Sequence, residues 1–237
     1  MGRFVNPDNT TFKAAINTKI YVDKTELIEF TNSLIGTTEN FICNSRPRRF
    51  GKSYTANMLS AYYSKGCDSQ ELFSSLAVAK NSAYREYLNK FDVIHFDLQW
   101  FFSKEHIDET VDLITKTIVD ELKTIYEGVL SADIRTIPDA LSQINAATGN
   151  RFVIIIDEWD MLIRDASKNK GIQDKYIDFL RRLFKGIEPE KYIALAYITG
   201  ILPIKKYNTQ SALNNFNEYT MLDPGSLAPY IGFTESE

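Results

Sequence analysis

The stretch Asn44-Ser45-Arg46-Pro47-Arg48-Arg49-Phe50-Gly51-Lys52-Ser53 decides how the rest of this chain is interpreted. A short apolar run, Phe41-Ile42-Cys43, precedes it, and the residues from Tyr54 to Lys65 have a helical pattern. A strand, a tight turn ending in Gly-Lys-Ser and a helix are together the context of a phosphate-binding loop. Backbone N–H groups and the positive end of the helix converge there, so the stretch predicts a site for a polyphosphate.

The loop residues have separate expected roles. Gly51 lets the backbone approach the ligand, Lys52 reaches the outer phosphates, and Ser53 places its hydroxyl on Mg²⁺. The match is imperfect, because an arginine occupies the position where the usual pattern has its first glycine. The triplet alone also fits a basic helix start that binds nothing. The residues that we expect to contact the nucleotide are Arg46, Pro47, Arg48, Arg49, Phe50, Gly51, Lys52, Ser53 and Tyr54.

The composition is that of an ordinary globular domain. The 237 residues are 44% hydrophobic, 13% aromatic and 24% charged, with a formal net charge of −4. This charge gives no support to nucleic-acid binding, although Arg46, Arg48 and Arg49 form a local basic patch. The cysteines and histidines lack a metal-ligand spacing, so a zinc site is not expected. No signal peptide or membrane-length apolar run is recognisable, so we expect a cytoplasmic protein with no membrane partner.

Buried strands alternate with helices along the chain. We expect strands at 41–44, 93–98, 152–156 and 192–198, and the main helices at 51–65, 105–130, 137–147 and 173–185. The run Phe152-Val153-Ile154-Ile155-Ile156 is typical of a strand buried on both faces. The alternation predicts an α/β fold in which helices sandwich a parallel sheet.

We divide the chain into three parts. Residues 1–40 form an N-terminal arm, irregular over 1–19, and a helix that packs on the core and has Asp23 as its N-cap. Residues 41–205 form the core that contains the phosphate loop. Residues 206–237 begin a C-terminal extension, which we expect to be truncated because no helix at the chain end would dock on the sheet.

The pair Asp157-Glu158 strengthens the prediction of a nucleotide site. Ligands of a parallel sheet bind beyond the carboxyl ends of the strands, where Lys52 and Ser53 would meet this pair. Ser53 suits Mg²⁺ as a direct ligand, Asp157 suits its water shell, and Glu158 suits deprotonation of an attacking water. Thr199 ends the next strand and would touch the γ-phosphate or that water. For the pair and for Thr199 a plain strand-ending turn is the alternative.

The long segment between the phosphate loop and Asp157 leaves room for an additional strand. We therefore predict the P-loop NTPase arrangement of the additional-strand type, in which a catalytic glutamate follows the metal-binding aspartate. In this arrangement the fourth strand lies between the first and the third. Asp97 ends the second strand and is a weaker candidate for the same site. The run Asn89-Lys90-Phe91-Asp92 matches a guanine-reading pattern, but it precedes a strand at the opposite pole of the sheet, so ATP is preferred.

Several functions are compatible with these features. We favour ATP binding with hydrolysis that drives a conformational switch, which would make the chain an ATPase. One alternative is a nucleotide-binding regulatory module with negligible turnover, and another is a DNA-associated protein acting with a missing nuclease domain. A small-molecule kinase would need a second substrate pocket. Arg181 and Arg182 fit either an arginine finger across a homo-oligomer contact or a solvated helix face.

Four segments together resemble the AAA-ATPase-like family of anaerobic bacteria, and the closing residues 230–235 also fit. In that family an arginine at position 46 is normal. The resemblance implies an ATP-binding domain in which the segment 21–25 lies near the base. It also implies a helical lid and a restriction-endonuclease-like nuclease domain as C-terminal partners. The segments are Tyr21-Val22-Asp23-Lys24-Thr25, Ser45-Arg46-Pro47-Arg48-Arg49-Phe50-Gly51-Lys52-Ser53, Ile156-Asp157-Glu158-Trp159-Asp160 and Ile198-Thr199-Gly200-Ile201-Leu202-Pro203.

Overall fold

A parallel sheet forms the centre of the protein. The computed structural model describes residues 2–204 and 213–233, and the statements below concern these residues. The order of strands across the sheet is β2-β3-β4-β1-β5, and all neighbours run parallel. β4 therefore lies between β1 and β3, as predicted. The strands are β1 (Phe41–Ser45), β2 (Asp92–Asp97), β3 (Phe152–Asp157), β4 (Ile193–Gly200) and β5 (Asn217–Tyr219).

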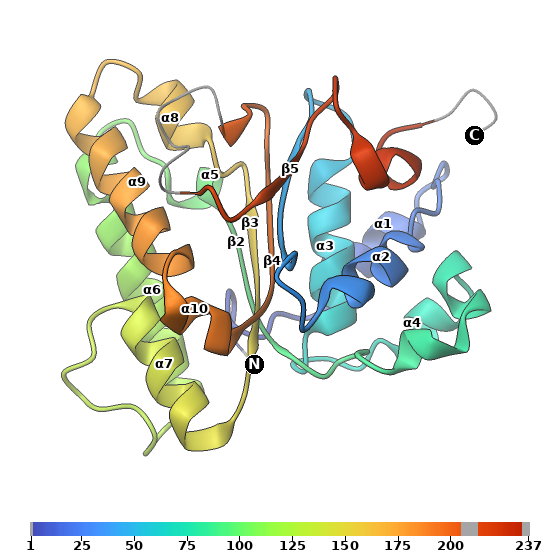
Figure 1. The fold of residues 1–237 in the computed structure, drawn as a ribbon, viewed down its shortest axis with the longest axis horizontal. Helices are drawn as coiled ribbons and strands as arrows, with labels where there is room; N and C mark the ends of the chain where they lie inside the picture. The colour runs from blue at the N-terminus through green and yellow to red at the C-terminus, as the bar shows by residue number, and fades with distance from the viewer. Residues whose placement is uncertain (1, 205–212, 234–237) are drawn as a thin grey trace.

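Helices cover both faces of the sheet (Figure 1). Because side chains alternate along a strand, Val153 and Ile155 of β3 pack toward α3, whereas Ile154 and Ile156 pack toward α6. The predicted α/β fold with a sheet sandwiched by helices is confirmed. One side carries α1 (Thr10–Ile16), α2 (Leu27–Leu34), α3 (Lys52–Tyr63) and α4 (Gln70–Ser74), and the other carries α6 (Thr110–Ile125), α7 (Ile137–Thr148), α9 (Lys170–Phe184) and α10 (Ile187–Tyr192).

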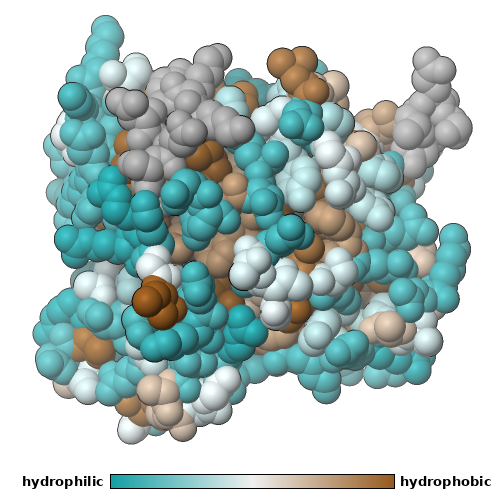
Figure 2. Space-filling model, viewed as in Figure 1, coloured by the Kyte–Doolittle hydropathy of each residue, from teal (hydrophilic) through white to brown (hydrophobic). Residues whose placement is uncertain are grey.

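On the face shown in Figure 2 the surface is mostly hydrophilic, and hydrophobic residues occur in small groups. None of the helices in the described part of the chain has the length and apolar character needed to cross a membrane.

Short helices and 3-10 turns connect the main elements. The short helices are α5 (Leu98–Phe101) and α8 (Met161–Asp165), and the 3-10 turns are Ala77–Lys80, Ser82–Arg85, Ile107–Glu109 and Gly225–Tyr230.

Two predicted helices have different limits in the structure. The helix predicted at 105–130 is regular only as α6, because the chain turns back soon afterwards and Lys123 Nζ donates to two carbonyls of that turn. The helix predicted to start at Asp23 begins at Leu27. The Asp23 carboxylate instead accepts the backbone N–H groups of Thr25 and Ala77, at 2.9 and 2.7 Å. It therefore joins two segments that are distant in sequence rather than capping a helix.

The N-terminal arm is more ordered than predicted. α1 occupies part of the segment predicted to be irregular, and its Phe12 stacks on Phe73 with ring centroids 5.2 Å apart. Both rings are buried. The few apolar residues of this polar segment are enough to fix a helix because they meet an aromatic cluster formed by later parts of the chain.

The residues before α1 form a strap along the free edge of β2. The His95 N–H donates to the Phe4 carbonyl at 2.8 Å. The Glu121 carboxylate of α6 accepts the backbone N–H groups of Arg3, Phe4 and Val5 at 3.0, 2.9 and 2.8 Å. The strap is thus attached to the sheet on one side and to a helix on the other.

The strand β5 comes from the segment predicted to be a C-terminal extension. It pairs in parallel with β1, with Asn217 opposite Ile42. Residues 217–219 are therefore part of the same sheet as the phosphate-loop strand. The predicted boundary between residues 205 and 206, and the Thr234-Glu235 end of the last family segment, lie outside the described residues.

We predict that Glu121→Ala destabilises the protein, because three backbone donors lose a charged acceptor. The expected loss in the free energy of unfolding is about 2 kcal/mol, measured by urea denaturation. Glu121→Gln keeps a side-chain oxygen of the same reach and should lose less. An unchanged urea midpoint for Glu121→Ala would show that the strap does not depend on this carboxylate.

Candidate functional site

The phosphate loop joins β1 to α3 at the carboxyl edge of the sheet. Arg49 and Gly51 both have left-handed backbone conformations, with φ of 69° and 75°. Left-handed residues in a loop turn successive N–H groups toward one side, which creates a concave site for an anion. The conformation is costly for Arg49, which is not a glycine, and such strain is concentrated at functional sites.

A cavity of about 590 Å³ lies over this loop. Its walls come from the segment around residues 20–24, from α3 and from the C-terminal residues 230–233. Glu158 also borders it. The lining residues from the loop and the start of α3 are Arg48, Arg49, Phe50, Gly51, Lys52, Ser53 and Tyr54.

Arg46 has a structural position between β1 and β5. Its guanidinium is buried and donates to the carbonyls of Ser45 and Tyr219, at 3.1 and 2.8 Å. Tyr219 belongs to β5, so Arg46 fastens this edge strand to the strand that leads into the loop. Among the described residues, Arg46 and Pro47 are not among those that line the cavity, and their contact with the nucleotide stays a prediction. The exposed basic patch is reduced to Arg48 and Arg49.

Lys52 is buried at the base of the cavity, with 5% of its surface exposed. Its Nζ donates to the Pro47 carbonyl at 3.1 Å and lies 4.0 Å from Glu158 Oε1. Burying an ammonium group costs free energy unless anions and hydrogen bonds compensate it. One carbonyl and a carboxylate at 4.0 Å give partial compensation, so a phosphate group is a favourable addition at this position.

Asp157 and Ser53 meet where β3 ends and α3 begins. The Ser53 side chain lies close enough to lower the pKa of Asp157, which is 4% exposed. Burial, together with the nearby Asp97 and Glu158 carboxylates, raises the pKa of Asp157 to about 6. A dication here would offset the mutual repulsion of these carboxylates.

These oxygen donors fit Mg²⁺ in its usual protein setting. The described residues contain no cluster of three or more histidine, cysteine or acidic side chains that would cage a metal. Mg²⁺ commonly takes one or two protein ligands and completes its shell with waters and substrate phosphates. Ser53 and Asp157 match this pattern.

Glu158 is held between two cations. Arg164 of α8 donates from Nη1 and Nη2 to Glu158 Oε2, at 3.2 and 3.1 Å, and Lys52 approaches the other oxygen. Glu158 also has a left-handed backbone, with φ of 52°. The pairing with Arg164 occupies a carboxylate oxygen that a nucleophilic water would need.

Asp160 connects this turn to the end of β4. It is fully buried and accepts the N–H groups of Ile201 and Leu202, at 3.2 and 2.8 Å. It also accepts Arg164 Nη1 at 2.8 Å, so Arg164 bridges Asp160 and Glu158. Sequence reasoning missed Arg164. The i, i+4 spacing of Asp160 and Arg164 is the sequence feature that indicates the pair.

Thr199 does not reach the cavity over the phosphate loop. It is fully buried, and its hydroxyl donates to the Asn44 carbonyl at 3.1 Å. Its own carbonyl accepts the Trp159 N–H, also at 3.1 Å. Thr199 thus links β1 to β4 and to the turn after β3, and its contact with the γ-phosphate stays a prediction.

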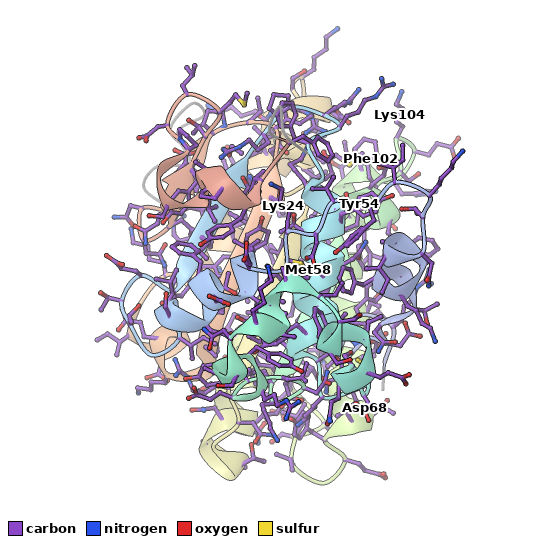
Figure 3. The ribbon with its side chains drawn as sticks, turned by 90° about the vertical axis from the view of Figure 1, so that its right-hand side faces the viewer. Lys24, Tyr54, Met58, Asp68, Phe102 and Lys104 are labelled. Atoms are coloured by element: carbon purple, nitrogen blue, oxygen red, sulfur yellow. The ribbon has the colours of Figure 1, made fainter. Side chains whose placement is uncertain are left out.

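Part of the cavity lining is apolar and aromatic. Figure 3 labels Tyr54 and Met58 of α3 and Lys24 of the segment before α2, and all three border the cavity. Tyr54 and Phe233 are exposed, so their rings are open to stacking with a flat ligand. The segment that the family resemblance places near the base thus lies beside the phosphate loop. The apolar lining residues include Ile20, Tyr21, Val22, Tyr54, Met58 and Phe233.

The remaining candidates from the sequence are Asp97 and the pair Arg181-Arg182. Asp97 lies opposite Asp157 in the register of β2 and β3, and its carboxylate accepts the Gln99 N–H at 2.8 Å. Burial raises its pKa, with a smaller contribution from Glu158. Arg182 and its neighbour Arg181 form ion pairs with Asp178 on the exposed side of α9.

We predict that Asp157→Asn stabilises the metal-free protein at pH 7.5 by roughly 2 to 3 kcal/mol. The carboxyl has a raised pKa in the folded state, so the folded state retains a proton between about pH 4 and 6 that the unfolded state has lost. Stability therefore falls as the pH rises through this range, and asparagine removes the penalty.

Urea denaturation in EDTA at pH 7.5 and pH 4 measures this effect. The two proteins should differ much less at pH 4, where Asp157 is protonated in the folded state and about half protonated in the unfolded state. A variant less stable than the wild type at pH 7.5 would contradict the raised pKa.

Two sequence comparisons relate the chain to known proteins. A protein described as "Uncharacterized protein in vnfD 5'region", from Azotobacter chroococcum mcd 1, is 28% identical over 224 residues. The match covers 92% of this chain and 40% of that protein, so the chain spans less than half of its relative. The sequence profile of a family described as "Predicted AAA-ATPase" matches residues 10–209. The chain therefore belongs to the AAA-ATPase-like family.

Proposed function

We propose that this chain binds ATP with Mg²⁺ and hydrolyses it to drive a conformational switch. The observation that supports this most directly is the convergence of Lys52, Ser53, Asp157 and Glu158 at one edge of the sheet. They lie next to a cavity whose lining combines the basic phosphate loop with aromatic and other apolar side chains. A nucleoside triphosphate likewise combines charged phosphates with a flat base.

In this proposal the loop residues hold the triphosphate. The N–H groups from Arg49 to Ser53 and the Lys52 ammonium bind the outer phosphates. Ser53 and Asp157 would hold Mg²⁺, which supplies charge neutralisation when bound. The exposed rings of Tyr54 and Phe233 provide stacking surfaces for adenine.

Glu158 is the proposed general base. It takes a proton from a water that attacks the γ-phosphorus, and the bond from that phosphorus to the bridging oxygen breaks. ADP and inorganic phosphate are the products. Glu158 must first break its ion pair with Arg164. When Lys52 moves toward the phosphates, the second contact of Glu158, at Oε1, is lost as well.

The same contacts offer a route for the switch. Arg164 bridges Glu158 and Asp160, and Asp160 holds the backbone of Ile201 and Leu202. A movement of the Glu158 side chain would therefore be transmitted through Arg164 and Asp160 to the backbone that follows β4. We propose that a helical lid or nuclease domain of the full-length protein responds to it, as the family resemblance implies. The matched relative is long enough to contain such domains.

A regulatory module with negligible turnover is the second candidate. It is favoured by the Arg164–Glu158 pair, which keeps the proposed base occupied in this structure. In that case nucleotide binding itself would be the regulatory event. Steady-state phosphate release distinguishes the two candidates.

We predict that Lys52→Ala abolishes ATP binding, because the buried cation that meets the phosphates is lost. Fluorescence titration with a labelled ATP analogue and Mg²⁺ measures this. Arg182→Ala on the exposed side of α9 is the matched control and should bind as the wild type does. Unchanged affinity of Lys52→Ala would place the nucleotide elsewhere.

We predict that Glu158→Gln binds ATP but does not release phosphate, since glutamine cannot accept the proton. Binding and phosphate release are measured on the same preparation. Wild-type turnover in this variant would show that the assigned base is wrong, while leaving the nucleotide site intact.

We predict that Arg164→Met raises the basal rate of phosphate release. A partly exposed ion pair is worth about 1 kcal/mol, which corresponds to roughly a fivefold change in rate. Methionine keeps much of the side-chain volume while it removes the charge. A loss of turnover comparable with that of Glu158→Gln would instead show that Arg164 is required for hydrolysis.

A further inference from the structure

A second cavity of about 460 Å³ lies between α3, the end of β2 and the N-terminal strap. Ser53 borders both this cavity and the one over the phosphate loop, and Asp157 lines the second one. The two cavities therefore share Ser53 and also Phe12, and the second one includes the other proposed metal ligand, Asp157. Of the residues that we expect to contact the nucleotide, Ser53 alone appears among the described residues that line the second cavity.

The walls of this cavity are polar although they belong to core elements. Ser53, Asn57 and Ser60 recur at helical spacing and form a polar stripe on α3. His95 and Asp97 are two residues apart on β2, so they share one face of that strand. A helix face and a strand face that packed against each other alone would be apolar, so this polarity indicates a ligand.

Ser60 gives an independent indication. Only 2% of this residue is exposed, and its hydroxyl has no hydrogen-bond partner among the described residues. Buried hydroxyl groups without a partner are rare and costly. Ser60 borders the cavity, and less than 1 Å² of its hydroxyl oxygen is accessible, so a ligand there supplies the missing partner when neighbouring side chains move aside.

The charges restrict the kind of ligand. Three carboxylates line the cavity, from Asp8, Asp97 and Asp157, against a single guanidinium from Arg3. Arg3 already lies over the Trp100 ring, with its Cζ 3.6 Å from the ring centroid. An anionic ligand would be repelled by this excess of negative charge.

The remaining polar groups favour hydroxyls. The pKa of His95 is lowered to about 4 by burial, so its imidazole is neutral at pH 7 and can both donate and accept. Ser60 and Asn57 can do the same. Hydroxyl groups match such mixed partners and also donate to carboxylates, whereas an ammonium group can only donate.

We propose that this cavity binds a small neutral polyol, of about the size of a monosaccharide, next to Ser53 and Asp157. Its volume lies within the usual range for small-molecule sites. A second substrate pocket is also what the kinase alternative required. Because Ser53 and Asp157 are shared, binding of the polyol and binding of Mg²⁺ with ATP must influence each other's affinity equally.

Trp100 provides a direct readout of the cavity. It lines the cavity and is 60% exposed, whereas the other tryptophan, Trp159, is buried. The experiment is a tryptophan fluorescence titration of the intact chain with ribose, glucose and myo-inositol. Nucleotide and Mg²⁺ are left out, so the outcome does not depend on the proposed ATP site.

At least one of these polyols should give a saturable change in fluorescence. Ser60→Ala and Asn57→Leu should each weaken its binding at least tenfold. Ser60→Ala removes an unpartnered group and should fold normally, which its circular dichroism spectrum verifies. Ser33→Ala on the exposed part of α2 is the control and should leave the affinity unchanged.

Inorganic phosphate and putrescine serve as the anionic and cationic probes. Neither should bind in the range where the polyol does. The proposal is overturned if no polyol gives a saturable change, if phosphate or putrescine binds instead, or if Ser60→Ala and Asn57→Leu both bind the polyol as tightly as the wild type.

Discussion

A buried ammonium group is the constraint on which the site depends. Lys52 starts α3 inside the protein, where its charge has the Pro47 carbonyl and, 4.0 Å away, one oxygen of Glu158. Incompletely compensated charge of this kind is costly in a protein interior. It lies beside a loop rich in N–H groups, so under the proposed function a polyanion would offset this cost. The left-handed backbone of Arg49 belongs to the same loop.

The position of β4 explains why the charged groups meet. It separates β1 from β3, so the loop after β1 and the Asp157-Glu158 turn after β3 face each other across one strand. Asp160 then fastens that turn to the residues after β4, and Arg164 fastens it to Glu158. The site is therefore a network of buried and partly buried ions across three strand ends.

The fold and part of the site could be predicted because their signals are local. Gly51-Lys52-Ser53 and the apolar run of β3 identify the elements, and the polarity of a parallel sheet brings their ends together. The contacts that could not be predicted are long-range. Arg46 donates to the Tyr219 carbonyl of β5, far along the chain, and the Thr199 hydroxyl donates to the Asn44 carbonyl. The strap, Arg164 and the second cavity likewise depend on which segments meet in space.

We expect phosphates to replace Glu158 and Pro47 as the partners of Lys52. A crystal structure of the Glu158→Gln chain with Mg²⁺ and ATP is the decisive measurement. The β- and γ-phosphates should lie against the N–H groups of residues 49–53, Lys52 Nζ should contact them, and Ser53 should contact the metal. A triphosphate bound away from the loop, or a Lys52 side chain that still donates to the Pro47 carbonyl beside it, would refute the proposed binding mode.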